Sequence, residues 1–459
     1  MLSTKGRVTG PSNALHAVGD ATINQLDAFS VKALTFEGHY DATVPSGHFP
    51  RANAQVNGHG TFLTVFDQSI QDASGTVSLD RQRLGFDVKL ARAGGVNGGL
   101  AGHVVLRPDR REIEFDDLTI TLGRSPWRLV QRTPAPVLTW TDAGFTITPV
   151  EIAGGSGDER LAVAGTWRSD GGGELHVTAN HVFLETLQGA LERPTRYGGV
   201  LDADAIVRGT RDLPIVTGTI SVSGGRIERV SYEKLAGRID YTNRQFAVDM
   251  RLDQGPGTWV EAKGTVPLAL FNTDLPVSPI DLAIKSSAVN LGLLAGVTDV
   301  VRDVAGTLEI NVTVIGTSAD PHFDGSIRIA NGSFLVRDSG SRYKNTRVAL
   351  TLARDRVTVE SLHVEDNNGR PLDVKGSLGT HELRVGDVEI DATARRFEVL
   401  RNPLGRVEVD IALQIRGRFE TPRVTGDITI GQSELKVDEI LDRTLFQPCL
   451  LYTSDAADE

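Results

Sequence analysis

The stretch Gly316-Thr-Ser-Ala-Asp-Pro-His-Phe-Asp-Gly-Ser-Ile-Arg-Ile329 contains the pattern on which the fold prediction depends. A glycine ends one strand and Pro321 starts a reversal, because its fixed φ favours a turn and its missing N–H keeps it off the hydrogen-bond ladder. Apolar Ile327 and Ile329 then alternate with a serine and an arginine. Alternation with a period of two predicts a strand with one buried and one solvated face.

The same pattern occurs three times, and the second glycines of the copies are 107 and 101 residues apart. The corresponding turn residues are Gly209, Pro214 and Gly218; Gly316, Pro321 and Gly325; and Gly417, Pro422 and Gly426. The apolar residues of the strand face, and of the segment after the next turn, are Ile220, Val222 and Ile227; Ile327, Ile329 and Phe334; and Ile428, Ile430 and Leu435. We expect these apolar residues to line a groove.

The length of the repeat, about a hundred residues, predicts the architecture. A parallel β-helix repeats every ~20–25 residues and a propeller blade every ~40–50. The longer period instead predicts an all-β protein with few short helices, in which an elongated antiparallel sheet curls into a groove. The predicted regions are a degenerate N-terminal β-repeat at 1–150, groove repeats at 151–265 and 266–376, and a truncated repeat at 377–448.

Each copy also contains a strand that leads to a helix-like patch. These segments are residues 176–187, 280–294 and 390–400. The patch Leu291–Val304 is predicted to be a short helix that plugs the groove or caps a sheet edge, and an amphipathic membrane element is the alternative.

The composition limits partners and location. The net charge of −11 makes nucleic acid a poor partner, since binding to its backbone needs a positive surface. No apolar run approaches the ~18–20 residues that span a bilayer, and the polar first residues form no signal peptide. The sequence therefore predicts either a cytosolic protein or one whose export signal and anchor lie outside this chain.

The last residues, 449–459, break the pattern of the rest. They resemble the translation of a common transposase sequencing adapter, so we expect the native sequence to end near Pro448. Cys449 is the only cysteine. Without it, no disulfide, thiolate nucleophile or cysteine metal site is expected.

Candidate chemistry is sparse. His39, His48 and His59 are the nearest group of histidines, but their spacing fits no metal site. The carboxylates within Glu112–Asp116 alternate with apolar residues, as on a solvated strand face. No phosphate-binding loop or nucleophile motif is found. The sequence therefore predicts no catalytic, cofactor or metal site and a non-enzymatic protein.

The three copies of Gly-x(4)-Pro-x(3)-Gly-x-Ile-x-Val/Ile resemble the TamB branch of the AsmA-like proteins, and Asp438–Arg443 follows the last copy. This resemblance covers most of residues 10–448. It implies a translocation and assembly module component of a Gram-negative envelope, held in the inner membrane by an N-terminal helix and crossing the periplasm as a taco-shaped β-groove. It also implies an outer-membrane partner that is TamA-like and related to BamA, and that is bound through a C-terminal domain. Both this C-terminal domain and the N-terminal anchor are expected to be missing from this chain.

The apolar residues predict a related function without the resemblance. A curled sheet lined by Ile, Val, Leu and Ala leaves a trough that suits phospholipid acyl chains, since each buried CH₂ contributes ~0.8 kcal/mol. We therefore expect a lipid carrier, and the resemblance implies that it acts between the inner and outer membranes. One alternative is a β-repeat surface adhesin or autotransporter passenger, which would show short parallel rungs. Another is a scaffold whose sheet edges support insertion and secretion of outer-membrane proteins.

Overall fold

The protein was analysed as a computed structural model. It describes residues 2–435 apart from 12, 29–30, 46–51, 66–67, 81–82, 92–96, 108–109, 123–124, 156, 191–196, 228–229, 273, 295–299, 382–383, 404 and 432. The predicted tail at 449–459 and Asp438–Arg443 therefore lie outside the described residues. The chain divides into two compact units, Met1–Arg226 with Ser231–Met250, and Ile227–Val230 with Arg251–Glu459. The predicted region boundaries at 150, 265, 376 and 448 stay predictions.

Long strands make up almost all of the first unit. Its strands are β1 Leu2–Thr9, β2 Ala14–Ala28, β3 Val31–Pro45, β4 Asn53–Val65, β5 Gln68–Asp80, β6 Arg83–Ala91, β7 Asn97–Leu106, β8 Arg111–Leu122, β9 Ser125–Leu129, β10 Val137–Thr141, β11 Gly144–Gly154, β12 Glu159–Arg168, β13 Leu175–Phe183, β14 Tyr197–Gly209, β15 Pro214–Ile227, β16 Val230–Thr242 and β17 Gln245–Gly255. One helix, α1 Leu184–Ala190, follows β13.

The second unit has the same character. Its strands are β18 Thr258–Pro267, β19 Pro279–Ser286, β20 Val289–Asn290, β21 Val301–Thr317, β22 Pro321–Val336, β23 Arg342–Arg354, β24 Arg356–Glu365, β25 Pro371–His381, β26 Arg384–Asn402, β27 Gly405–Arg418, β28 Thr421–Ile430 and β29 Glu434–Leu435. Two 3₁₀ turns, η2 Leu268–Leu270 and η3 Leu291–Leu294, follow β18 and β20.

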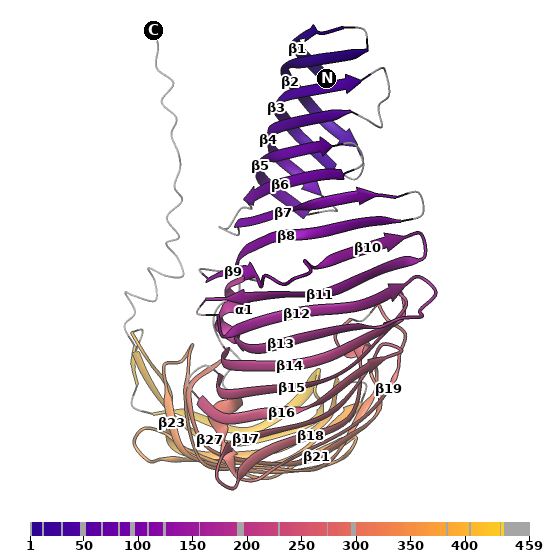
Figure 1. Cartoon of the computed structure of the whole chain (residues 1–459). Helices are drawn as coiled ribbons and strands as arrows, with labels where there is room; N and C mark the ends of the chain where they lie inside the picture. Colours follow the sequence, from indigo (N-terminus) through magenta and orange to yellow (C-terminus); the bar gives the residue numbers. More distant parts are fainter. Residues whose placement is uncertain are drawn as a thin grey trace, which may run out of the picture. The chain divides into compact units, whose positions relative to one another are not determined.

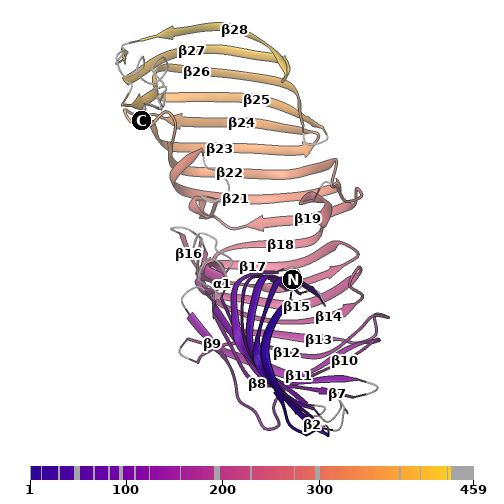
Figure 2. The same ribbon diagram turned by 90° about the horizontal axis from the view of Figure 1, so that it is seen from above.

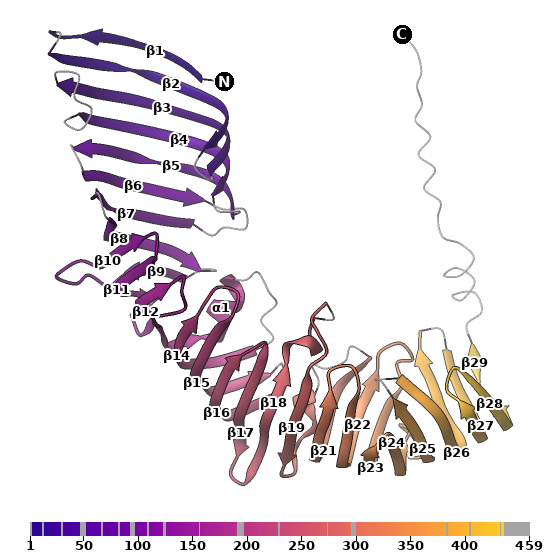
Figure 3. The ribbon, with the colours of Figure 1, turned by 90° about the vertical axis from the view of Figure 1, so that its right-hand side faces the viewer.

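Within the first unit, successive strands pair antiparallel from β1 to β8 and from β11 to β14. The short strands β9 and β10 both lie between β8 and β11, so together they fill one strand position. Figure 1 shows these strands following one another in chain order. Helix α1 lies beside β13 and β14 (Figure 3).

Within the second unit, β18 pairs with β19, and antiparallel pairs continue from β21 to β28. The strands β19 and β20 both pair with β21, and β28 and β29 both pair with β27. Figure 2 shows β21–β28 side by side in chain order. The nearly all-β antiparallel architecture confirms the predicted fold class.

The glycine of the repeated motif has a steric role. Gly325 has φ +133°, and a Cβ at this position would lie 1.9 Å from the carbonyl oxygen of Asn311 on the neighbouring strand. Gly426, its counterpart in the next copy, has φ +121° and a Cβ there would lie 1.9 Å from the carbonyl oxygen of Ala412. Only glycine allows the strands to approach this closely in that conformation.

One sequence expectation about local structure is wrong. Residues 390–400 form no helix-like patch, because they lie inside the strand β26. The first two patches do contain a helical turn, α1 and η3. In the third copy the chain remains paired with β27 as far as Asn402, with register shifts near Phe397 and Leu400.

Candidate functional site: an apolar sheet face

The second unit carries a continuous apolar face. Directly opposed residues of antiparallel strands project from the same side of the sheet, so the register defines rows. One row contains Ile310, Ile327, Leu350, Val359, Gly376, Ile390, Ile415 and Val424, and the next contains Leu308, Ile329, Val348, Leu362, Val374, Ala392, Leu413 and Gly426. Every member is apolar or glycine.

The opposite face of the same strands is polar. One of its rows contains Asn311, Ser326, Thr351, Thr358, Ser377, Glu389, Arg416 and Arg423. Arg416 contacts Glu389 and Asp391, and the Nη2 of Arg416 donates to Asp391 at 2.7 Å. The sheet of this unit is therefore amphipathic, and the polar face is stabilised by cross-strand charge pairs.

The first unit repeats this arrangement. One apolar row contains Gly38, Gly58, Gly75, Val88, Leu100 and Leu118, and another contains Tyr40, Val56, Val77, Phe86, Gly102 and Phe115. A polar row next to them contains His39, Asn57, Thr76, Asp87, Ala101 and Asp117. Glycine is frequent on this apolar face, which leaves room above the strands for the ring of Phe36 at Gly58.

Two of the predicted groove residues lie at the middle of the second unit. Ile327 and Ile329 of β22 are half-buried, opposite Ile310 and Leu308, and both pack against buried residues. Phe334, farther along β22, has its ring 5.4 Å from the ring of Tyr343.

The predicted residues of the third copy are far more accessible. Ile428 and Ile430 of β28 lie opposite Ile411 and Val409, but 60% and 68% of their surface is exposed. Leu435 of β29 pairs with β27, opposite Gly405. The apolar face is thus least covered at β28.

The predicted residues of the first copy lie on β15. Val222 is buried with 3% exposure, whereas Ile220 is half-buried. Ile227, at the end of this strand, is half-buried and falls within the second unit. The motif therefore located strand positions of similar kind in all three copies, whereas their role as a groove lining stays a prediction.

Sequence reasoning missed most of the apolar face. The opposing residues on β23, β24 and β27, such as Leu350, Val359 and Leu413, belong to no repeated motif. Their period-two alternation was the available signal, as in Val348, Leu350 and Leu352. Pairing could not be deduced from it, because alternation fixes the face of a strand and not its partner.

An aromatic and ionic cluster borders the apolar face at one end of β26 and β27. The ring of Phe397 stacks on that of Tyr343 at 5.3 Å, and Phe397 is nearly fully buried. Beside it, the fully buried carboxylate of Glu398 accepts two hydrogen bonds from Arg401, each 2.7 Å long. These hydrogen bonds lower the pKa of Glu398 and keep it ionised.

Two further buried carboxylates complete this cluster. Glu408 contacts Arg370 and Arg406, and the hydrogen bond from Arg370 is the main cause of its lowered pKa. Asp366 accepts a hydrogen bond from the backbone N–H of Glu398 at 3.0 Å. The hairpin end between β24 and β25 is thereby fixed to β26, and this end of the sheet is stabilised by charge in addition to the apolar packing around Phe397.

The histidines lie on the polar faces. Each histidine whose side chain is described contacts an aspartate carboxylate at 2.6–3.4 Å, as do His16 with Asp41 and His363 with Asp373. His48 lies outside the described residues. Among the residues described, no three His, Cys, Asp or Glu side chains are grouped to hold a metal ion.

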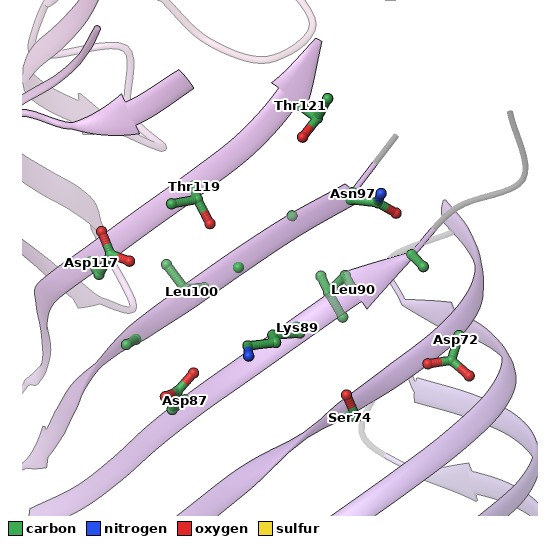
Figure 4. A pocket seen from close by; sticks show the side chains of 14 residues that line it. Asp72, Ser74, Asp87, Lys89, Leu90, Asn97, Leu100, Asp117, Thr119 and Thr121 are labelled. Carbon is green, nitrogen blue, oxygen red and sulfur yellow. The ribbon is translucent and has the colours of Figure 1, made fainter. Parts of the chain in front are cut away.

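A pocket on the first unit has a mixed lining. Its polar part comes from β5–β8 and includes the carboxylates of Asp87 and Asp117, the hydroxyl of Thr119 and the ammonium of Lys89 (Figure 4). Leu90, Leu100 and several small residues form the rest of the lining. The pocket therefore offers polar and apolar contacts alike. In the described part of the chain, no helix is long and apolar enough to cross a membrane.

Residues 360–448 match the family model described as the TamB C-terminal domain. The comparisons with curated proteins and with solved structures gave no match. The match covers β25–β28 and agrees with the resemblance found in the repeats. It corrects the expectation that the C-terminal domain is missing altogether, because these residues themselves resemble that domain.

Proposed function

We propose that this chain, a TamB-like protein, is a non-enzymatic carrier of phospholipid in a bacterial envelope, with the acyl chains held on the apolar sheet face. The observation that carries this proposal is the unbroken apolar register from Ile310 on β21 to Val424 on β28. A face of this length serves no single small ligand.

The energetics favour a flexible apolar occupant. Each methylene group removed from water contributes about 0.8 kcal/mol, so an acyl chain that covers part of this face gains several kcal/mol. Ile428 and Ile430 are exposed on that face, and covering them removes apolar surface from water. The charged headgroup would remain in water, where the polar residues of the strand ends accept it.

The groove lining is then formed by the motif residues and by their cross-strand partners. Its proposed members from the motif are Ile220, Val222, Ile227, Ile327, Ile329, Phe334, Ile428, Ile430 and Leu435. The sheet needs no cofactor for this function, because sliding of a lipid along an apolar face involves no bond change.

The family match supports our proposal for the cellular setting. The match to the TamB C-terminal domain supports a place in the translocation and assembly module system of the envelope. We propose that the full-length protein lies in the periplasm, is anchored in the inner membrane, and cooperates with a TamA-like outer-membrane β-barrel in outer-membrane protein assembly. The proposed partner follows from the family match and not from a surface of the sheet.

The adhesin alternative is less well supported. Short parallel rungs are the feature expected of it, whereas the pairs described in both units are antiparallel and β26 extends over Arg384–Asn402. The sheet also separates apolar and polar residues onto two faces, which leaves one face unsuited to a solvated fibre surface.

Lipid extraction from the purified full chain tests the proposal. Native mass spectrometry of protein isolated from bacterial membranes should show bound phospholipid. Ile415→Asp, on the apolar face, should lose it, whereas Gln414→Asp, on the adjacent polar position, should retain it. A protein that carries no lipid, or two variants with equal lipid content, would overturn the proposal.

A further inference from the structure

In the first two repeats, the chain forms a helical turn beside the apolar face at the same position of the repeat. Val182 and Val289 are 107 positions apart, and their exposed fractions are 0% and 1%. Each is followed two residues later by a helical turn, α1 beginning at Leu184 and η3 beginning at Leu291. The turns are therefore equivalent parts of the repeat and not isolated insertions.

The turn η3 covers predicted groove residues. Val289, Leu291 and Leu308 form one buried cluster, against which Ile327 and Ile329 pack. Leu308 lies opposite Ile329 of β22 on one side and opposite Val289 of β20 on the other, so the root of η3 belongs to the same apolar cluster as that face. An acyl chain could not take over the contacts of this cluster with Ile327 and Ile329 while the cluster stays intact.

The two turns are held differently. The buried carboxylate of Glu159 accepts hydrogen bonds from the backbone N–H of Phe183 at 3.0 Å and from the hydroxyl of Thr186 at 3.3 Å, which fixes the start of α1. Gln188 also bonds the backbone of Tyr197 in both directions. Hydrogen bonds to a charged group are stronger than neutral ones, so α1 is firmly attached to its unit.

The root of η3 has weaker attachments. The backbone N–H of Asn290 donates to the side-chain oxygen of Gln254 at 2.9 Å, and Asn290 accepts from the N–H of Gly292 at 2.8 Å. Both bonds are neutral, and each such bond contributes only about 1 kcal/mol net. The strand β20 that precedes η3 contains Val289 and Asn290 alone. Besides its short pairing with Leu308 and Thr307 of β21, apolar contact within this cluster keeps η3 in place.

The third repeat has no such turn. Phe397 is the buried residue at the corresponding place, with 2% exposure, but the strand β26 continues past it to Asn402. Its ring stacks on Tyr343 at the end of the face instead of covering the middle. Among the described residues of this repeat, no such turn covers the apolar face at Ile411 and Ile428.

We propose that the segment Val289–Leu293 is a displaceable plug that must leave Ile327 and Ile329 before an acyl chain can pass along β21 and β22. The inference rests on the proposed lipid-carrying function. An acyl chain offers the face the same kind of contact that Leu291 and Leu293 provide, so the exchange leaves little apolar surface uncovered. The helix α1 is instead a fixed cover.

A reversible disulfide can hold the plug in place. Val289 lies directly opposite Leu308, and opposed Cβ atoms are ~4.5–5.5 Å apart, close to the range that a disulfide spans. The variant combines Val289→Cys and Leu308→Cys with Cys449→Ser. A matched control combines Thr358→Cys and Ser377→Cys, which are opposed on the polar face.

The readout is photolabelling of the full chain by vesicles of phosphatidylethanolamine and phosphatidylglycerol with a photoactivatable acyl chain. The oxidised plug variant should lose labelling at β22 and keep labelling at β27, and a reductant should restore it. The reduced variant shows that the substitutions leave the fold intact, and the control pair should be labelled alike in both states. Equal β22 labelling of the oxidised and reduced plug variant would overturn the plug, whereas no labelling of any reduced protein would instead overturn the lipid-carrying function.

Discussion

Glu398→Gln tests whether the buried charge cluster holds the end of β26 and β27. The carboxylate of Glu398 is fully buried and contacts Arg401 at 2.7 Å and Arg406 at 2.8 Å. Removing one partner of a buried ion pair costs about 3–5 kcal/mol. Because 45% and 40% of the two arginine side chains are exposed and can be rehydrated, we expect a smaller loss of about 2–3 kcal/mol, just below this range.

Thermal and urea unfolding of the full chain measure this loss. For a unit of this size, each kcal/mol lowers the melting temperature by about 2–4 °C, so the transition should fall by about 4–12 °C. Glu389→Gln is the matched control, because Glu389 is 63% exposed and lies 3.5 Å from its arginine. Its effect should stay within about 0.5 kcal/mol. Equal losses in the two variants would refute the structural role of the cluster.

The same cluster gives a pH dependence with a defined sign. The arginines lower the pKa of Glu398 and of Glu408 in the folded state. Their contribution is complete above the unfolded value of about 4.3 and is lost as the pH falls through the lowered folded values. Urea midpoints should therefore fall more between pH 6 and pH 3 for the wild type than for Glu398→Gln. A parallel fall in both proteins would contradict this linkage.

Two other predictions compare variants on the two faces of the sheet and variants at two glycines. Ile327→Asp places a charge on the apolar face. It should destabilise the protein by about 3 kcal/mol or more and abolish lipid co-purification, whereas Arg328→Glu should change stability and lipid content little. An Ile327→Asp protein that still carries lipid would contradict the assignment of the apolar face. Gly325→Ala should lower the free energy of unfolding in urea by about 1–3 kcal/mol, because Gly325 has a positive φ and lies close to the carbonyl of Asn311. Gly386→Ala is the control and should stay near wild type, because the nearest atom to a Cβ at Gly386 is 3.7 Å away. Similar losses of stability in both variants would show that the motif glycine is dispensable.

The repeated motif was a good predictor of the strands because it records local chemistry. Pro321 and Gly325 mark a turn and a close approach of strands, and Ile327 and Ile329 mark one face. These features act over a few residues, so they can be deduced from a single sequence. The all-β antiparallel class followed from their spacing.

The rest of the candidate site depends on pairing between distant residues. Glu398 and Asp366 meet only because β24, β25 and β26 pair in a particular register. Residues 390–400 are of the same kinds as those in the patches that form α1 and η3, yet residues 390–400 form part of the strand β26. We attribute the difference to the charge cluster that β26 joins at its end, since local propensity alone is a weak predictor there.

This difference also sets the direction in which a lipid would meet obstacles. A chain entering at β28 first meets the exposed Ile428 and then the half-buried Ile415 and Ile390, and reaches the plug only at Ile329. Of the residues that the structure describes in this unit, none has to be displaced for binding on β26–β28, whereas passage beyond β22 requires the plug to leave. Lipid should consequently load at the family-matched end more readily than it crosses β22, and the two steps should be separable by the disulfide that joins positions 289 and 308.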